Sequence, residues 1–445
     1  MKNNYILIIS IALLSFAVTA VYGQRRQLSL KDAVDLAIEN NPELKIAKLE
    51  VSRSQQQKVL SRALVLPSVN AFGQANHYFQ LPPFFGFGTT AQAEGKIPYG
   101  RFGGEDQLAA GVTAIQPIFN PQAYPALQRA RLSERESKLA STAKQIAILS
   151  SIKQNYLRQL VLSERIKLQR ESINRNNRVL KDARALYVQG KGLRVDTLRA
   201  YTSLKTLEPE LLQLLYAHET GNIQLKTLIG IDSLQEIELT DSLYVPETEV
   251  IPGEEEVYAS AKQNNPEVLS IVIQEEIAEQ QARQANAARL PVVSAVGLFQ
   301  VQTQTNSFEY GKAYYPASSY VGLQLSVPLF SGFGNEAKIK QANMAKEQSV
   351  LRSKYTHEQL RSLVHQTVAN GREAIVRLQA TATVKETAKL TYDIIQYRYV
   401  KGIASRLELN DAELALTASQ SSYLEAVFDY LSARIALDRI MGRAW

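Results

Sequence analysis

The chain has 445 residues, a formal net charge of +7 and no cysteine. The absence of cysteine excludes disulfides and thiolate metal sites. Residues 121–200 hold seventeen Lys or Arg against six Asp or Glu, whereas residues 232–256 hold nine acids and no base. Such separate stretches are typical of solvated helix faces and a polar linker, so the charge pattern argues against nucleic acid as a partner.

The start of the chain has the pattern of a secretory signal peptide. Lys2 precedes an apolar run from Tyr5 to Ala20, and compact residues follow before Gln24. We therefore expect residues 1–23 to be removed as a signal peptide. A membrane anchor is the alternative, but the run is shorter than the roughly 20 apolar residues that a spanning helix needs.

The rest of the chain contains one unit twice, which is visible as five short matches in the same order. They pair NNPE at 40–43 with 264–267, LPSV at 66–69 with LPVV at 290–293, QPIF at 116–119 with VPLF at 327–330, YVQG at 187–190 with YVKG at 399–402, and LIG at 228–230 with IMG at 440–442. Ordered self-similarity of this kind indicates structural repeats. We expect repeats at 24–230 and 253–445, joined by an acidic linker at 231–252.

Each repeat continues from a first helix into a pair of strands, expected at about 66–119 and 291–330. The helix ends before Pro67 or Pro291, as a proline favours. Apolar and polar residues then alternate, which predicts strands with one apolar face. The apolar positions include Val69, Ala71, Gly73 and Ala75 in the first repeat and Val321, Leu323, Leu325 and Val327 in the second. Four strands leave an open sheet with unpaired edges.

After each strand pair the apolar residues recur in steps of three or four, which predicts long helices. Residues 121–187 contain no proline or glycine beyond Pro125 and Pro121, enough for a helix of roughly 100 Å. The narrow apolar seam of such a helix must pack on neighbouring helices, as in a coiled coil. Gly190 and Gly402 suit the left-handed end of a helix. We expect the chain to reverse there, giving helical hairpins at about 121–229 and 335–440.

These elements predict a mainly α protein with β strands, in which neither the strands nor the helices of one copy satisfy themselves. The doubled motifs resemble the TolC family of outer-membrane efflux proteins over essentially the whole mature chain. The resemblance implies a TolC-like channel-tunnel: a homotrimer with a periplasmic α-barrel of long hairpins and a 12-stranded transmembrane β-barrel, four strands from each protomer. An equatorial region would form from the start of the chain and the linker.

The resemblance also implies a function in passive export. The protein would lie in the outer membrane, with its helical part in the periplasm, and connect an inner-membrane pump and a periplasmic adaptor protein to the exterior. Its partners would be these two proteins, further copies of itself and outer-membrane lipid, with no cofactor. The cargo, whether drug, metal or protein, is left open because the pump selects it.

The resemblance further places a periplasmic gate and the adaptor-docking tips at the helix reversals. The implied gate residues are Asp196, Tyr399, Glu408 and Asp411, and the implied tip residues are Gly190 and Gly402. One departure is Ala404, where the best-known members carry an arginine; Arg406 follows two positions later. The alternative interpretation is that the acids are ordinary charges at helix N-termini, favoured by the helix dipole.

Other classes of function have less support. The four histidines, His77, His218, His357 and His365, show no metal-ligand spacing, and no catalytic constellation is recognisable, so we expect neither a metal site nor an enzyme. The aromatic stretch at 84–88 lacks the spacing of a phosphate loop and is interpreted as an extracellular loop. A soluble periplasmic helical scaffold or adaptor remains the alternative to the export channel.

Overall fold

The structure is a computed structural model that describes residues 26–85, 99–245, 250–306 and 310–443. The expected signal peptide at 1–23 and most of the aromatic stretch at 84–88 lie outside the described residues. The chain forms two compact units, and each takes segments from both repeats. The helical unit comprises Met1–Val51, Ser137–Ile271 and Lys354–Trp445, and the sheet unit comprises Ser52–Glu136 and Val272–Ser353. In the described part of the chain, no helix combines the length and apolarity needed to cross a membrane.

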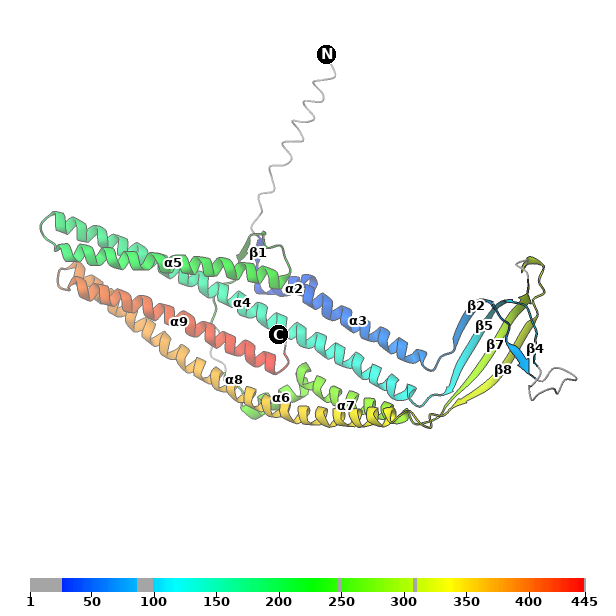
Figure 1. Ribbon diagram of the computed structural model, residues 1–445. Coiled ribbons are helices and arrows are strands. Elements are labelled where there is room, and N and C mark those ends of the chain that lie inside the picture. Colours follow the sequence, from blue (N-terminus) through cyan, green and yellow to red (C-terminus); the bar gives the residue numbers. More distant parts are fainter. Residues whose placement is uncertain (1–25, 86–98, 246–249, 307–309, 444–445) are drawn as a thin grey trace, which may run out of the picture. The chain divides into compact units, whose positions relative to one another are not determined.

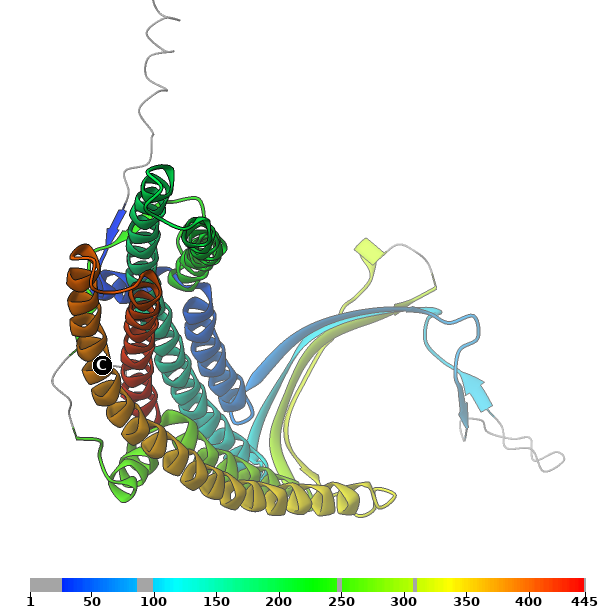
Figure 2. The same ribbon diagram turned by 90° about the vertical axis from the view of Figure 1, so that its left-hand side faces the viewer.

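The sheet unit contains a four-stranded antiparallel sheet in the order β2-β5-β7-β8. The strands are β2 (Ser68–His77), β5 (Asp106–Phe119), β7 (Val292–Thr305) and β8 (Ala317–Ser326). They run side by side and curve together (Figures 1 and 2). The central pair, β5 and β7, joins the two repeats. A small separate sheet of β3 (Pro83–Phe85) and β4 (Tyr99–Arg101) was not anticipated from the alternation pattern.

The register confirms that the apolar positions of all four strands share one face. One row across the sheet reads Val69, Ala114, Gly297 and Val321, and the next reads Ala71, Val112, Phe299 and Ser319. The opposite face is rich in amides, with rows that include Gln74 and Gln302, and Asn76, Gln107 and Gln304. In the single chain the apolar face is open: Val321 is 88% and Leu323 is 75% exposed.

The long helices follow the strands, as the period of three or four predicted. After β5 comes α4 (Ala123–Val188, 66 residues), and after β8 comes α8 (Gly334–Val400, 67 residues). Each turns back into a shorter helix, α5 (Arg194–Ile229) or α9 (Arg406–Ile440) (Figure 1). The shorter helices that lead into the strands are α3 (Pro42–Ala63) and α7 (Pro266–Ala287). Both begin with a proline, which suits a first helical position because no N–H bond is lost there.

The first described residues, from Arg26 on, lie beside the acidic linker in the helical unit. Strand β1 (Arg26–Leu28) pairs in parallel with β6 (Ile237–Leu239), and α2 (Leu30–Asn40) follows β1. A capping box between Ser29 and Asp32 fixes the start of α2. In the second repeat, α6 (Glu254–Asn264) takes the place of α2.

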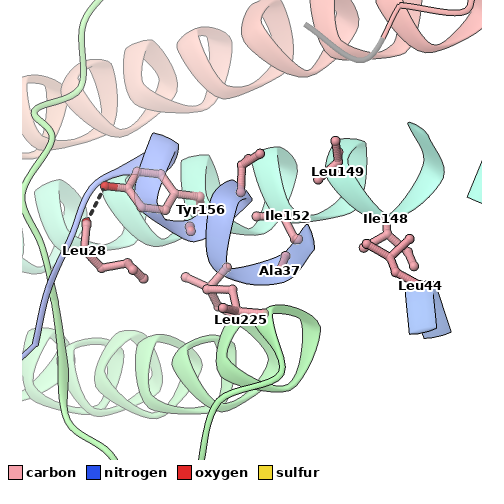
Figure 3. Close-up of a cluster of buried hydrophobic side chains, with 11 residues drawn as sticks. Leu28, Ala37, Leu44, Ile148, Leu149, Ile152, Tyr156 and Leu225 are labelled. Atoms are coloured by element: carbon pink, nitrogen blue, oxygen red, sulfur yellow. Dashed lines mark hydrogen bonds between the residues drawn. The ribbon is translucent and has the colours of Figure 1, made fainter. Parts of the chain in front are cut away.

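A hydrophobic cluster joins these segments to the first hairpin (Figure 3). Its buried members come from residues 28–44, from α4 and from α5, and include Leu28, Val34, Ala37, Leu44, Leu149, Ile152, Tyr156, Leu225 and Ile229. The Tyr156 hydroxyl lies 2.9 Å from the Leu28 carbonyl oxygen and 2.8 Å from the Asp241 carboxylate. Burial, with the neighbouring carboxylate of Asp241, raises the pKa of Tyr156, so the phenol stays protonated as a donor.

The second asparagine of each NNPE motif connects the start of its repeat to the end. The Asn41 side-chain amide donates to the Leu228 carbonyl oxygen at 2.6 Å, and Asn265 donates to Ile440 at 2.9 Å. The side-chain oxygens of both asparagines accept backbone N–H groups from the first turns of α3 and α7, at 3.0 Å and 2.9 Å. Each asparagine therefore caps one helix and holds the last carbonyls of another.

Glycine is required where these helix ends meet. Gly230 and Gly442 adopt left-handed backbones with φ of 81° and 75°. A Cβ would lie 2.8 Å from the backbone of Asn40 at Gly230, and 2.4 Å from the Asn264 carbonyl oxygen at Gly442. Both the conformation and the close approach exclude a side chain. In each repeat, the NNPE motif at the start thus contacts the LIG or IMG motif at the end.

Candidate functional site

The candidate site consists of the reversals at the ends of the two hairpins. Gly190 and Gly402 have φ of 71° and 73°, in the left-handed region. After them the N–H groups of Lys191 and Ile403 donate back to the carbonyl oxygens of Leu186 and Arg398, both at 2.9 Å. These bonds satisfy carbonyls that the last helical turn leaves open. A Cβ on either glycine would meet no atom within 4 Å, so backbone conformation alone selects glycine here.

Glu408 lies in the first turn of α9, where it forms part of a capping box. The Ser405 N–H donates to the Glu408 carboxylate at 2.5 Å, and the Glu408 N–H donates to the Ser405 hydroxyl at 3.2 Å. Hydrogen bonds from the backbone and the side chain of Ser405 to the carboxylate lower the pKa of the exposed Glu408 carboxyl. The interpretation as a helix-terminal acid therefore describes its local role.

Asp411 and Asp196 take part in no capping box, although Asp196 also lies in the first turn of its helix. Asp411 is exposed and lies one turn after Glu408, on the same face of α9. Asp196 is half-buried in the first turn of α5, whose N-cap residue, Leu193, makes no side-chain capping bond. No carboxylate of these two residues forms an ion pair within the described residues. Asp411 thus presents a free acid on the open surface of the second hairpin.

Tyr399 contacts the cation that follows the reversal. Its ring is half-buried against a cluster of Tyr392, Leu409 and Leu416. The Arg406 guanidinium carbon lies 5.9 Å from the centre of the Tyr399 ring, within the range of a cation–π contact. Ala404, the position at which the sequence departs from the arginine that the resemblance implies, is buried. A cation therefore reaches Tyr399 from position 406 instead.

A buried ion pair with an additional hydrogen bond connects the two hairpins. The sequence analysis did not predict this contact. The Glu413 side chain on α9 is 7% exposed and accepts from Arg175 Nε at 3.1 Å and from the Asn176 amide at 2.9 Å, both on α4. Burial raises the pKa of Glu413, and the Arg175 guanidinium opposes that shift. Arg175 also lies 5.9 Å over the ring of Tyr392 on α8. The only signal in the sequence is an acid within the apolar seam Leu409, Ala412 and Leu416.

Comparison with known proteins gives one family over most of the chain. The family model described as outer membrane efflux protein matches residues 33–231 and 257–443. The alkaline protease secretion protein AprF of Pseudomonas aeruginosa is 24% identical over 423 residues, which covers 91% of this chain and 82% of AprF. The pyoverdine export outer membrane protein OpmQ of the same species is 23% identical over 425 residues, which covers 94% of this chain and 85% of OpmQ.

Solved structures have the same fold. A membrane protein from Pseudomonas aeruginosa superposes with a TM-score of 0.78 at 18% identity, covering 94% of this chain and 90% of that one. The outer membrane protein VceC of Vibrio cholerae gives 0.75 at 18% identity, covering 93% and 96%. The fold is thus the TolC-like channel-tunnel that the motifs indicated. Because the family model covers most of its length, this chain belongs to the outer membrane efflux protein family, as a channel protein of the outer membrane rather than an enzyme.

Proposed function

We propose that three copies of this chain form one outer-membrane channel of a tripartite export system. The channel conducts solutes passively from an inner-membrane pump and a periplasmic adaptor to the exterior. The observation that carries the proposal is the set of apolar surfaces that one copy leaves open, on the sheet and on the helices alike.

The sheet has two chemically different faces and two open edges. Its apolar face, with Val321 and Leu323 largely exposed, suits lipid, and its amide-rich face suits a water-filled lumen. The edges are β2 and β8, which pair with no strand on their outer side in the described part of the chain. Unpaired edges cannot be left in lipid, so β8 of one copy pairs with β2 of the next in our proposal.

The helices also expose coiled-coil seams. On α8, residues at alternating steps of four and three are all exposed: Val376, Ala380, Thr383, Thr387, Leu390, Ile394 and Tyr397. On α5, Leu212, Tyr216 and Ile223 are exposed at similar spacing. Among the residues that the structure describes, no helix of the same copy covers these seams, and a second copy of the chain offers the matching surface. We infer that α8 of one copy packs on α5 of its neighbour.

Three-fold symmetry would gather the acids of the second hairpin into a constriction. Glu408 and Asp411 of three copies then place like charges around one axis, which attracts cations and disfavours tight closure unless the charges are solvated or paired. Tyr399 and Arg406 support the reversal beside them, and Asp196 gives a further carboxylate from the first hairpin. The tips at Gly190 and Gly402 are the proposed docking points for the adaptor.

Single-channel recording in planar bilayers tests the proposal. The purified mature chain should give discrete conductance steps with preference for cations. If the purified chain is soluble in plain buffer without detergent and gives no conductance steps, the proposed function is contradicted.

A further inference from the structure

Near the reversal of the first hairpin, α4 presents a polar stripe with coiled-coil spacing. Its residues are separated by alternating steps of four and three, and every one is exposed: Arg170, Asn174, Asn177, Lys181, Arg184 and Val188. Such spacing places them along one line of the helix surface for nearly three heptads. We call these six residues the basic stripe.

The cations of the basic stripe form no ion pair with a carboxylate among the described residues. Some other cations on α4 do: Lys167 lies 2.6 Å from Glu164, and Arg175 lies 3.1 Å from Glu413. Lys181 and Arg184 are three residues apart, so they repel each other across one helical turn. The stripe therefore places three cations without a paired acid along one line of the helix.

The second repeat shows that the stripe is not a consequence of the fold. The equivalent positions on α8, 212 residues later, carry Ala382, Glu386, Lys389, Asp393 and Gln396, with balanced charge. Lys389 there pairs with Asp393 at 3.5 Å. At the second reversal, Lys401 lies over the ring of Tyr397 at 5.6 Å. At these equivalent positions the second hairpin thus carries balanced charge, whereas the first carries net positive charge.

The spacing and the charge together define the partner that the stripe fits. A helix that packs along α4 would meet residues at every third or fourth position, and asparagine is a residue that coiled coils accept at such positions. Opposite charges at the contact would come from Asp or Glu. At the tip, Val188 is 84% and Leu193 is 67% exposed, which adds an apolar contact at the end of the stripe. A small anion would use neither the heptad spacing nor the apolar end.

We propose that the basic stripe binds an α-helix of a periplasmic partner protein that carries acidic residues at heptad spacing. The inference rests on the proposed docking role of the hairpin tips and adds the chemistry of the partner. It also assigns this contact to the first hairpin alone. Charge complementarity of this kind mainly raises the association rate and the specificity, and it weakens with salt.

Two synthetic helical peptides of about three heptads test the charge preference. They share one apolar sequence and carry either Glu or Lys at the contact positions. By fluorescence anisotropy on the detergent-solubilised channel, we expect the Glu peptide to bind about tenfold more tightly than the Lys peptide, with affinity falling as salt rises. Lys181→Glu with Arg184→Glu should abolish that preference, whereas Lys389→Glu on the second hairpin should leave it unchanged. Equal binding of both peptides, or a preference that survives the charge reversal, would overturn the proposal.

Photo-cross-linking in cells distinguishes a partner helix from a second copy of this chain. With a benzophenone side chain at Asn177, the expected adduct joins a different protein through a peptide with acids at heptad spacing. An adduct with another copy of this chain, or none, would overturn the proposal. Conductance of the unmodified chain in planar bilayers separates the two hypotheses. An unmodified chain that conducts normally but does not bind the Glu peptide means that only the docking inference fails, and an unmodified chain that does not conduct means that the proposed channel fails.

Discussion

The two helical hairpins of this chain share a backbone and differ in their surfaces. Both reverse at a left-handed glycine, and both are held at their far ends by an asparagine and a second glycine. The first hairpin then exposes unpaired cations, and the second exposes acids and a long apolar seam. The repeated residues thus specify the backbone, whereas the residues that differ between the repeats form the surfaces that we propose contact other molecules.

The largest effect is expected at the buried link that joins the hairpins. Glu413→Ala leaves the largely buried Arg175 with only the longer contact to Glu171 at 3.8 Å, and losing one partner of a buried pair costs up to about 3–5 kcal/mol. We expect a lower thermal unfolding temperature for the detergent-solubilised protein. Replacing both partners, Arg175→Met with Glu413→Leu, should restore most of the loss, since no charge is then buried alone. Equal loss in the single and double variants would show that the ion pair is not the cause.

The repeated asparagines allow a direct comparison of the two repeats. Asn41→Ala and Asn265→Ala each remove a helix cap and one bond to a carbonyl oxygen, with an expected cost of about 1–3 kcal/mol. Because the two contacts have the same geometry, the unfolding transitions should shift by similar amounts. Asn40→Ala, one residue earlier in the same motif, is the control and should cost less. A large difference between the two variants would mean that the repeats are not equivalent here.

The acids of the second hairpin should control ion selectivity. Glu408→Gln with Asp411→Asn removes two charges per copy, and the permeability ratio of cations to anions should fall about two- to threefold. The first hairpin supplies a matched comparison, because its equivalent positions are Asp196 and Arg199, with no net charge. Asp196→Asn should change the ratio less. Ser405→Ala breaks the capping box but keeps both acids, so a similar change in that variant would assign the effect to the cap instead.

The smallest effect concerns the pH dependence of the second reversal. Hydrogen bonds from Ser405 lower the pKa of Glu408 below its unfolded value. The cap therefore stabilises the start of α9 at pH values above about 4.3, and this contribution is lost as the pH falls through the folded pKa. Protection from hydrogen exchange at residues 405–409, corrected for the intrinsic exchange rate, should fall in acid relative to the uncapped start of α5. Glu408→Gln should abolish this difference and Ser405→Ala should only reduce it, because alanine keeps the backbone N–H that donates to Glu408. Protection that does not respond to acid would contradict the assignment.

Much of the fold could be predicted from the sequence because both repeats show the same order of elements. The alternation around Val69 and Val321 predicted strands with one apolar face, and the register places both residues in one row. The glycines at 190 and 402 marked the reversals. Family membership also decides against the soluble scaffold that the sequence had left as an alternative.

The contacts between helices were not accessible in this way. Arg175 and Glu413 are 238 residues apart, and the apolar spacing of their helices does not predict which helices pack against each other. The repeated NNPE motif was visible, but the bond from Asn41 to the end of α5 appears only in three dimensions. The role of Glu408 as a cap depends on the Ser405 geometry, and the contact of Arg406 with Tyr399 depends on the path of the reversal. Local patterns thus predict elements, whereas pairing between distant elements needs the structure.

The mass of the detergent-solubilised protein tests the assembly of three copies most directly. It is measured by light scattering with the detergent contribution subtracted. The open strand edges and the exposed seams on α5 and α8 require neighbours, so we expect the mass of three mature chains. Val376→Lys with Leu390→Lys, on the exposed seam of α8, should reduce that mass while the helical content is kept. A stable monomer of the unmodified chain, with its apolar surfaces left open, would contradict the account.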